Sequence, residues 1–145
     1  MLRTCRQFVL AFLLSSSLGL ALAAHAEEVS FFGIKGEHLP EWSVLTDKQT
    51  LIFRADTQDA WIRVSKADLS WQDDDFEVPA RLFAEGMGGR NIRYVEGNVE
   101  FETAQGEQAF LERFGNVALL FTVHGQGDDF YRVLGSIALD EQVAQ

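Results

Sequence analysis

One stretch near the C-terminal end constrains the fold of this chain most. Residues 117–123 (Val-Ala-Leu-Leu-Phe-Thr-Val) are apolar at nearly every position, so a strand made from them is apolar on both faces. Such a strand is stable in the middle of a sheet that is covered above and below. We therefore expect a central strand here, with further structure packed on both sides of its sheet.

The segment that follows this strand has the pattern of a helix able to provide part of that cover. Asp128 and Asp129 suit the positive N-terminal end of a helix. Apolar residues then recur at helical spacing: Phe130, Val133, Leu134 and Ile137. We predict an amphipathic helix that buries these four side chains.

A second helix is predicted earlier in the chain, over residues 80–87. Pro79 is compatible with its first turn, and Gly88 with Gly89 ends it. The residues that we place on one face of this helix are Leu82, Phe83, Gly86 and Met87.

The remaining patterns are those of antiparallel strands. We predict strands at 29–34, near 43–45, at 49–55, 60–65, 91–96, 99–103 and 108–114. The strands at 49–55 and 60–65 form a hairpin in which Ile62 and Val64 point inward. In 99–103 apolar residues alternate with glutamates, which predicts a half-exposed strand with a wet outer face. The fold class is α+β: an antiparallel sheet of about six to seven strands with two main helices packed on it.

The N-terminal end has the three parts of a secretory signal. Arg3 and Arg6 precede an apolar run, and Ala24, His25 and Ala26 form a small-x-small cleavage site. A transmembrane anchor is the alternative, but serines 15–17 and Gly19 interrupt a run that is already short of the roughly 20 residues a spanning helix needs. We predict cleavage of residues 1–26 after Ala26, a single domain over 27–145, and a periplasmic or secreted location.

The predicted cleavage changes the net charge of the chain and removes its one cysteine. Residues 1–26 hold two of the 12 lysines and arginines and none of the 22 acidic residues, so the mature chain has a formal charge of −12. Such a charge disfavours nucleic acid and anionic lipid, so we expect no nucleic-acid partner and no membrane insertion after cleavage. Cys5 leaves with the signal, so the mature domain has no disulfide and must be held by its apolar core. We expect no cofactor.

A family resemblance rests on short packing motifs. They are Pro40 and Trp42 ahead of a strand, the hairpin through Ile62 and Val64, the helix 80–87 ended by Gly88 and Gly89, the meander of strands, and the closing Leu134, Gly135, Ser136 and Ile137. In this order they resemble the PsbP-like family, which includes extrinsic subunits of the oxygen-evolving photosystem, a Ran-binding nuclear protein and many small bacterial envelope proteins. The likeness spans nearly the whole mature domain and implies its fold, while its motifs say little of function.

Two sets of residues are candidates for a site. His124, at the end of the central strand, is followed across a Gly-rich turn by Asp128 and Asp129, a set that suits a metal ion or an oriented imidazole. Trp61 and Trp71 have the large apolar faces of a ligand groove. We place Trp61 on the sheet face opposite Ile62 and Val64, with Phe53 or under a helix.

The leading hypothesis for function is a non-catalytic binding or accessory module of the cell envelope, with a protein or small-molecule partner. The first alternative is a small metal-dependent or hydrolytic enzyme centred on His124, Asp128 and Asp129. However, the serines of the mature chain lie outside the G-x-S-x-G context of a nucleophile elbow. The second alternative is a carrier of a small apolar ligand.

Overall fold

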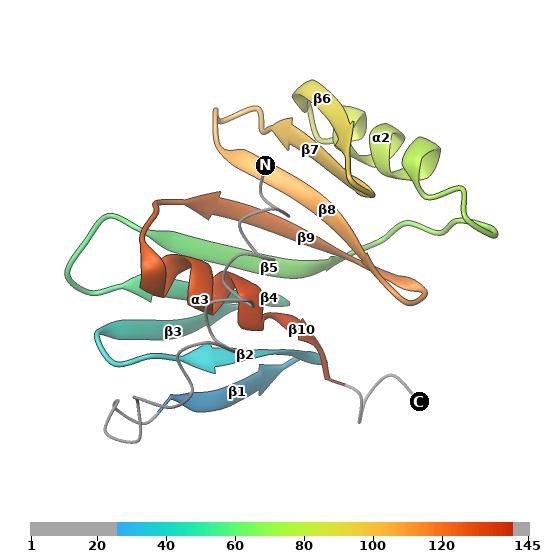
Figure 1. Cartoon of the computed structure of the whole chain (residues 1–145). Coiled ribbons are helices and arrows are strands. Elements are labelled where there is room, and N and C mark those ends of the chain that lie inside the picture. Colours follow the sequence, from blue (N-terminus) through green and yellow to red (C-terminus); the bar gives the residue numbers. More distant parts are fainter. Residues whose placement is uncertain (1–25, 141–145) are drawn as a thin grey trace.

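Over residues 26–140, the part of the chain that the structure describes, the computed structural model is an α+β fold with two antiparallel sheets and two helices. The predicted signal peptide therefore lies, except for Ala26, outside the described residues. The strands of the large sheet, in the order in which they lie side by side, are β3 (Trp42–Asp47), β4 (Thr50–Ala55), β5 (Trp61–Ala67), β9 (Val117–His124), β8 (Gln108–Phe114), β7 (Asn98–Glu102) and β6 (Arg90–Val95) (Figure 1). The predicted central strand is confirmed, because β9 is the fourth of these seven.

The small sheet was not foreseen as a separate layer. It contains β1 (Glu27–Phe31), β2 (Ile34–His38) and β10 (Ala138–Leu139), with β2 in the middle. The single strand predicted at 29–34 is wrong, because the chain turns back at Phe32 and Gly33, whose φ angles are 56° and 77°. Positive φ at two adjacent residues is the geometry of a tight hairpin turn. Gly33 is the residue in the sequence that indicates this turn, because glycine adopts positive φ readily.

The hairpin of β4 and β5 has the predicted arrangement. Phe53 lies directly opposite Ile62, and Leu51 opposite Val64. All four side chains are buried in one cluster, so Ile62 and Val64 do point into the core.

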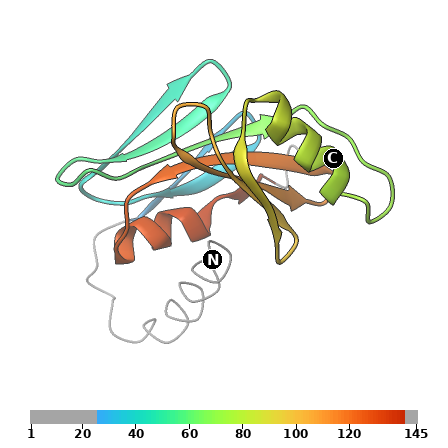
Figure 2. The same cartoon turned by 90° about the horizontal axis from the view of Figure 1, so that it is seen from above.

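The two helices cover opposite faces of the large sheet (Figure 2). Helix α3 (Asp128–Ser136) and the small sheet lie on one face, and α2 (Glu77–Gly86) lies on the other, over β6 and β7. Neighbouring residues of β8 accordingly enter different clusters: Phe110 belongs to the cluster under α3, and Leu111 to the cluster under α2. We call these clusters the α3 core and the α2 core. The four residues predicted to be buried by the last helix are all in the α3 core.

The buried face of α2 differs from the predicted one. Ala80 and Ala84 are fully buried, whereas Leu82 is 61% exposed. The helix ends close to the sheet: a Cβ added at Gly89 would lie 2.6 Å from the carbonyl oxygen of Ala84 and 2.9 Å from the ring of Phe101. Ala80 and Ala84 therefore face the sheet and Leu82 faces water, whereas Phe83, one of the four residues predicted for the buried face, does pack on the α2 core.

Within residues 26–140, neither helix is long and apolar enough to cross a bilayer.

Candidate functional site

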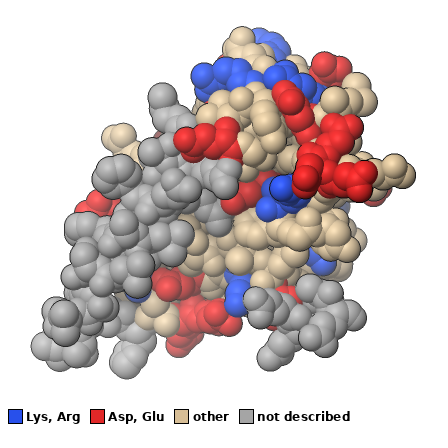
Figure 3. Space-filling view, turned by 45° about the vertical axis from the view of Figure 1, so that its right-hand side comes forward, with Lys and Arg blue, Asp and Glu red and all other residues tan. Residues whose placement is uncertain are grey.

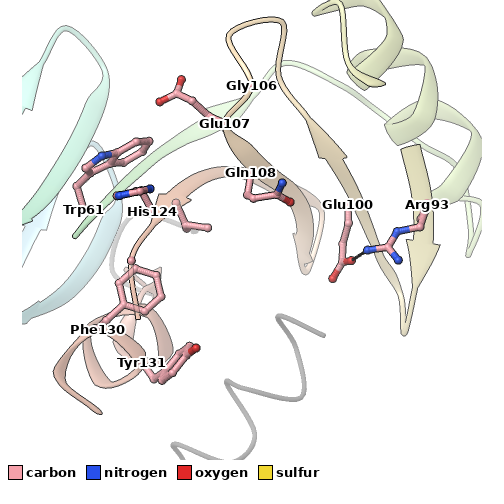
Figure 4. A pocket seen from close by; sticks show the side chains of 11 residues that line it. Trp61, Arg93, Glu100, Gly106, Glu107, Gln108, His124, Phe130 and Tyr131 are labelled. Atoms are coloured by element: carbon pink, nitrogen blue, oxygen red, sulfur yellow. Dashed lines mark hydrogen bonds and ion pairs between the residues drawn. The ribbon is translucent and has the colours of Figure 1, made fainter. Parts of the chain in front are cut away.

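A pocket of about 450 Å³ lies where β5 begins and β9 ends, between the end of the large sheet and the start of α3 (Figure 4). This volume is within the roughly 300–1,000 Å³ that is typical of small-molecule sites. Its lining comes from five strands, the loop before β8, the turn after β9 and helix α3. The residues are Trp61, Arg93, Glu100, Gly106, Glu107, Gln108, Val123, His124, Gly125, Phe130 and Tyr131.

The first wall of the pocket consists of Trp61 and His124, which the register of the sheet places side by side. Trp61, the first residue of β5, lies directly opposite His124, the last residue of β9. The chain then leaves β9 at Gly125, whose φ of 116° is rarely adopted by residues with a side chain. A Cβ there would lie 2.4 Å from that of Ala60, so the close approach also requires glycine. Gly125 thus allows His124 to end its strand beside Trp61.

Trp61 is held by ring contacts on this wall. The His124 imidazole stacks on the indole, with centroids 5.9 Å apart and an interplanar angle of 25°. The Arg63 guanidinium lies 4.2 Å from the centroid of the indole ring, which is cation–π geometry. Arg63 also donates a hydrogen bond to Glu107 in the loop before β8, so the indole is fixed from two strands and a loop.

His124 has a carboxylate partner from the loop between β4 and β5. Its Nε2 lies 2.9 Å from an oxygen of Asp59. The side chains of His124 and Asp59 are 51% and 87% exposed. A contact so open to water contributes about 0–1 kcal/mol to stability, so its main effect is to orient the imidazole.

The second wall holds a carboxylate that is almost removed from water. Arg93 of β6 donates a hydrogen bond to Glu100 of β7 across 3.1 Å. The Glu100 side chain is only 9% exposed, whereas that of Arg93 is 66% exposed. The predicted wet outer face of this strand is therefore wrong at Glu100, which lies opposite the buried Phe110.

Helix α3 provides the remaining wall. Phe130 and Tyr131, in its first turns, pack edge to face with ring centroids 5.2 Å apart. Figure 4 shows the three walls around one space: Trp61 with His124 on one side, Glu100 with Arg93 on the other, and the two α3 rings below. The pocket thus combines aromatic surface with a deep carboxylate.

No family model and no curated protein matches the sequence. Among solved structures, one from Bacteroides thetaiotaomicron VPI-5482 is similar, with a TM-score of 0.49 and 10% sequence identity. The match covers 80% of this chain and 49% of that one, so the chain spans about half the length of that structure. Such a likeness says nothing of function.

The two tryptophans proposed for a ligand groove lie in different places. Trp61 lines the pocket, as described above. Trp71 instead packs on Phe76 beside the α2 core, with ring centroids 4.9 Å apart. Nor does Trp61 lie with Phe53, because Phe53 is on the opposite face, in the α3 core with Ile62.

The residues proposed for a metal site are not brought together as one. His124 contacts Asp59, and Asp128 and Asp129 begin α3 outside the pocket lining. Within residues 26–140, no three His, Cys, Asp or Glu side chains gather closely enough to hold a metal ion. The carboxylate partner of His124 was sought in the turn after β9, but the hairpin loop before β5 provides it.

Sequence reasoning missed the acidic wall of the pocket, although a signal for it was present. Glu96 and Gly97 have φ angles of 51° and 87°, the geometry of a two-residue hairpin turn. A turn at these two residues places Arg93 opposite Glu100. Glu96 and Gly97 thus predict that Arg93 and Glu100 pair. The burial of Glu100, in contrast, depends on what packs over the sheet.

Proposed function

We propose that this chain is an exported, non-catalytic binding module of the cell envelope that holds a small molecule in the pocket beside Trp61. The predicted signal peptide and the acid-rich mature chain support export. The PsbP-like resemblance is in accord with an accessory role. The compartment and the family both stay predictions.

The pocket is the observation that carries the binding role. Its walls come from elements far apart in the sequence, and a rigid sheet positions most of them. Ligand sites typically combine aromatic surface with a few fixed polar groups, which here are the Glu100 carboxylate and the Gln108 amide. The pocket therefore has the composition of a site that recognises a ligand by shape and one or two polar contacts.

The composition of the lining also explains why we favour binding over hydrolysis. The Asp59–His124 pair resembles half of an acid–base set. However, the described residues that line the pocket include no serine, threonine or cysteine to act as its nucleophile. Holding the Trp61 ring is a sufficient role for His124.

Tryptophan emission tests the proposal, with a matched control within the chain. Low-molecular-mass extract of the envelope is added to protein purified from cells that express the full-length chain. We expect an emission change that the Trp61→Phe variant abolishes and the Trp71→Phe variant keeps, because only Trp61 lines the pocket. A change that depends on Trp71 alone, or no change at all, would contradict the proposal.

Export has its own test. N-terminal sequencing of protein recovered from the envelope fraction or the medium is expected to begin at Glu27. A sequence that begins at Met1 would refute the export part of the proposal.

A further inference from the structure

We infer that the hairpin of β3 and β4 docks on the same hairpin of a second copy of this chain, in a weak dimer with two-fold symmetry. The contact uses the side chains of the hairpin that point away from the α3 core, which we call the open face: Ser43, Leu45, Asp47, Thr50, Ile52 and Arg54. This inference goes beyond the small-molecule role of the pocket and does not depend on it.

The first argument is that the open face carries apolar side chains but has no cover. Within residues 26–140, neither helix packs on it: α2 contacts β6 and β7 at the far end of the large sheet (Figure 2), and α3 lies on the opposite side. Leu45 is 41% exposed, and Ile52, directly opposite it, is half-buried. A sheet face turned to water usually carries polar residues, so an apolar pair in the middle of this one indicates a further contact.

The second argument is the order of charges along the open face. The register places Arg54 at one end of the hairpin and Asp47 at the other, with the apolar pair between them. The row of Arg54 is four residues along the strand from the row of Asp47, a separation of about 13 Å. A positive end, an apolar middle and a negative end form a pattern that a two-fold rotation makes complementary to itself.

The third argument is that both charged ends lack a counter-ion in the described part of the chain. Six of the seven arginines in residues 26–140 have a carboxylate oxygen within 4.0 Å, and Arg54 is the exception. Asp47 has no cationic partner among these residues either. Both side chains are exposed, so they are available to pair across an interface.

A two-fold axis that runs across the strands, at the level of Leu45 and Ile52, gives the complementary contact. It reverses the strand direction of the second copy, so Arg54 of each copy faces the row of Asp47 in the other. Sheets that pack face to face lie about 10 Å apart, a gap that the long stem of an arginine can span. An axis along the strands would instead bring the two Arg54 side chains together, so the charges favour the first arrangement.

The neighbouring strand β5 does not oppose this contact by its charge. Arg63 lies opposite Ile52, so the axis brings it towards its own copy. However, Arg63 donates a hydrogen bond to Glu107, which neutralises it, and its guanidinium lies on the Trp61 ring.

Net charge and area limit the strength of the dimer. The mature chain has a formal charge of −12, and Figure 3 shows acidic side chains in several groups over the visible surface. Two copies therefore repel each other at long range, although about 0.15 M salt screens charges more than roughly 8 Å apart. The face of one hairpin is also smaller than the roughly 800 Å² per partner of a standard interface. We therefore expect a reversible dimer that forms at high protein concentration.

Analytical ultracentrifugation tests the inference on protein purified from cells that express the full-length chain. The concentration is varied over roughly 1 μM to 1 mM, a range that covers weak association, in about 0.15 M salt. We expect monomer at the low end and dimer at the high end.

Charge reversal tests the pairing itself. Arg54→Asp places like charges at both ends of the interface and is expected to weaken association about tenfold or more, as is Asp47→Arg. The double variant Arg54→Asp with Asp47→Arg is expected to restore association, because opposite charges face each other again. Lys66→Asp is the matched control, since it changes the net charge as much as Arg54→Asp but lies on the opposite side of the sheet, next to Leu119 of the α3 core.

A variant without a charge change tests the apolar middle. Leu45→Ser is expected to weaken association about tenfold, since the leucines of both copies would lose apolar contact area. Because Leu45 is exposed, this change is expected to leave the circular dichroism spectrum unaltered.

Four outcomes would overturn the inference. They are a monomer at every concentration, equal weakening by Arg54→Asp and Lys66→Asp, a double variant that associates no better than the single ones, and slower hydrogen exchange of the β3 amides in the dimer. The last would mean that the copies pair edge to edge along β3. The concentration series on the unmodified protein decides the matter even if a variant fails to fold, and the Trp61 emission test of the pocket stands apart from all four.

Discussion

The α3 core and the α2 core solve the same problem, the covering of one face of a sheet, with different side chains. The α3 core is built on large residues, among them Phe53, Phe110, Phe121 and Phe130. The α2 core has an alanine at five of its nine buried positions: Ala67, Ala80, Ala84, Ala109 and Ala118. Large rings fill the space under α3 and the small sheet, whereas small side chains let α2 lie close on β6 and β7.

The two cores cover opposite faces of the large sheet and meet along β9. Phe121 points to one core and Ala118 to the other. Each half of the sheet therefore has one face less completely covered, and the pocket opens where the cover changes from one face to the other. The difference teaches that the site exists because the two cores cover different halves of the sheet. Phe130 and Tyr131 belong to α3, which covers one half, and Arg93 and Glu100 belong to strands of the other half.

The largest effect is expected from removing a ring in the α3 core. Phe53 is fully buried, and Gly36 makes room for its ring, since a Cβ at Gly36 would lie 2.7 Å from the Phe53 Cζ atom. Phe53→Ala is expected to lower the free energy of unfolding by about 3–5 kcal/mol, because a cavity is left in a packed core. Urea denaturation followed by circular dichroism measures this, with Phe53→Leu as the milder control. A loss below about 1 kcal/mol would show that this core can collapse around the gap.

An intermediate effect is expected from enlarging a residue in the α2 core. Ala84 is fully buried between helix and sheet, so Ala84→Leu is expected to cost about 1–3 kcal/mol through overpacking. Leu82→Ala, on the exposed side of the same helix, is the control and is expected to change stability by about 0.5 kcal/mol or less. The reverse ranking, from the same denaturation curves, would mean that α2 buries the leucine face.

The smallest effect is expected at the rim of the pocket. Asp59→Asn removes the charge that contacts His124, and because both side chains are largely in water we expect a stability change of about 0–1 kcal/mol. The same variant is expected to broaden or shift the Trp61 indole N–H signal, since the imidazole that stacks on it loses its anchor. An unchanged Trp61 signal would show that the sheet register alone positions the two rings.

Much of the fold was predictable because its signals are local. The run at 117–123 identified the central strand, and the spacing of Phe130, Val133 and Leu134 identified both α3 and its buried face. The hairpin of β4 and β5 followed from a polar loop between apolar runs. Prediction was wrong in part for the buried face of α2: Phe83 packs on the α2 core as predicted, but Leu82 is exposed and the buried positions are Ala80 and Ala84.

The candidate site was only partly predictable. Trp61 and His124 were both singled out, but for separate sites, and the register of β5 with β9 is what places them together. Arg93 and Glu100 were predicted only as residues of two strands, 91–96 and the half-exposed 99–103. Their importance depends on Glu100 being buried, which a single strand does not encode.

By itself, the sequence determined the α+β class, the central strand, the hairpin of β4 and β5 and the amphipathic last helix, because each depends on residues within a few positions of one another. Only the tertiary structure decided that a second sheet forms, that the helices lie on opposite faces, and that a buried carboxylate shares a pocket with Trp61. These features depend on contacts between segments far apart in the chain. Such contacts are set by the size of the side chains that must fit between packed layers, and no local pattern records that fit.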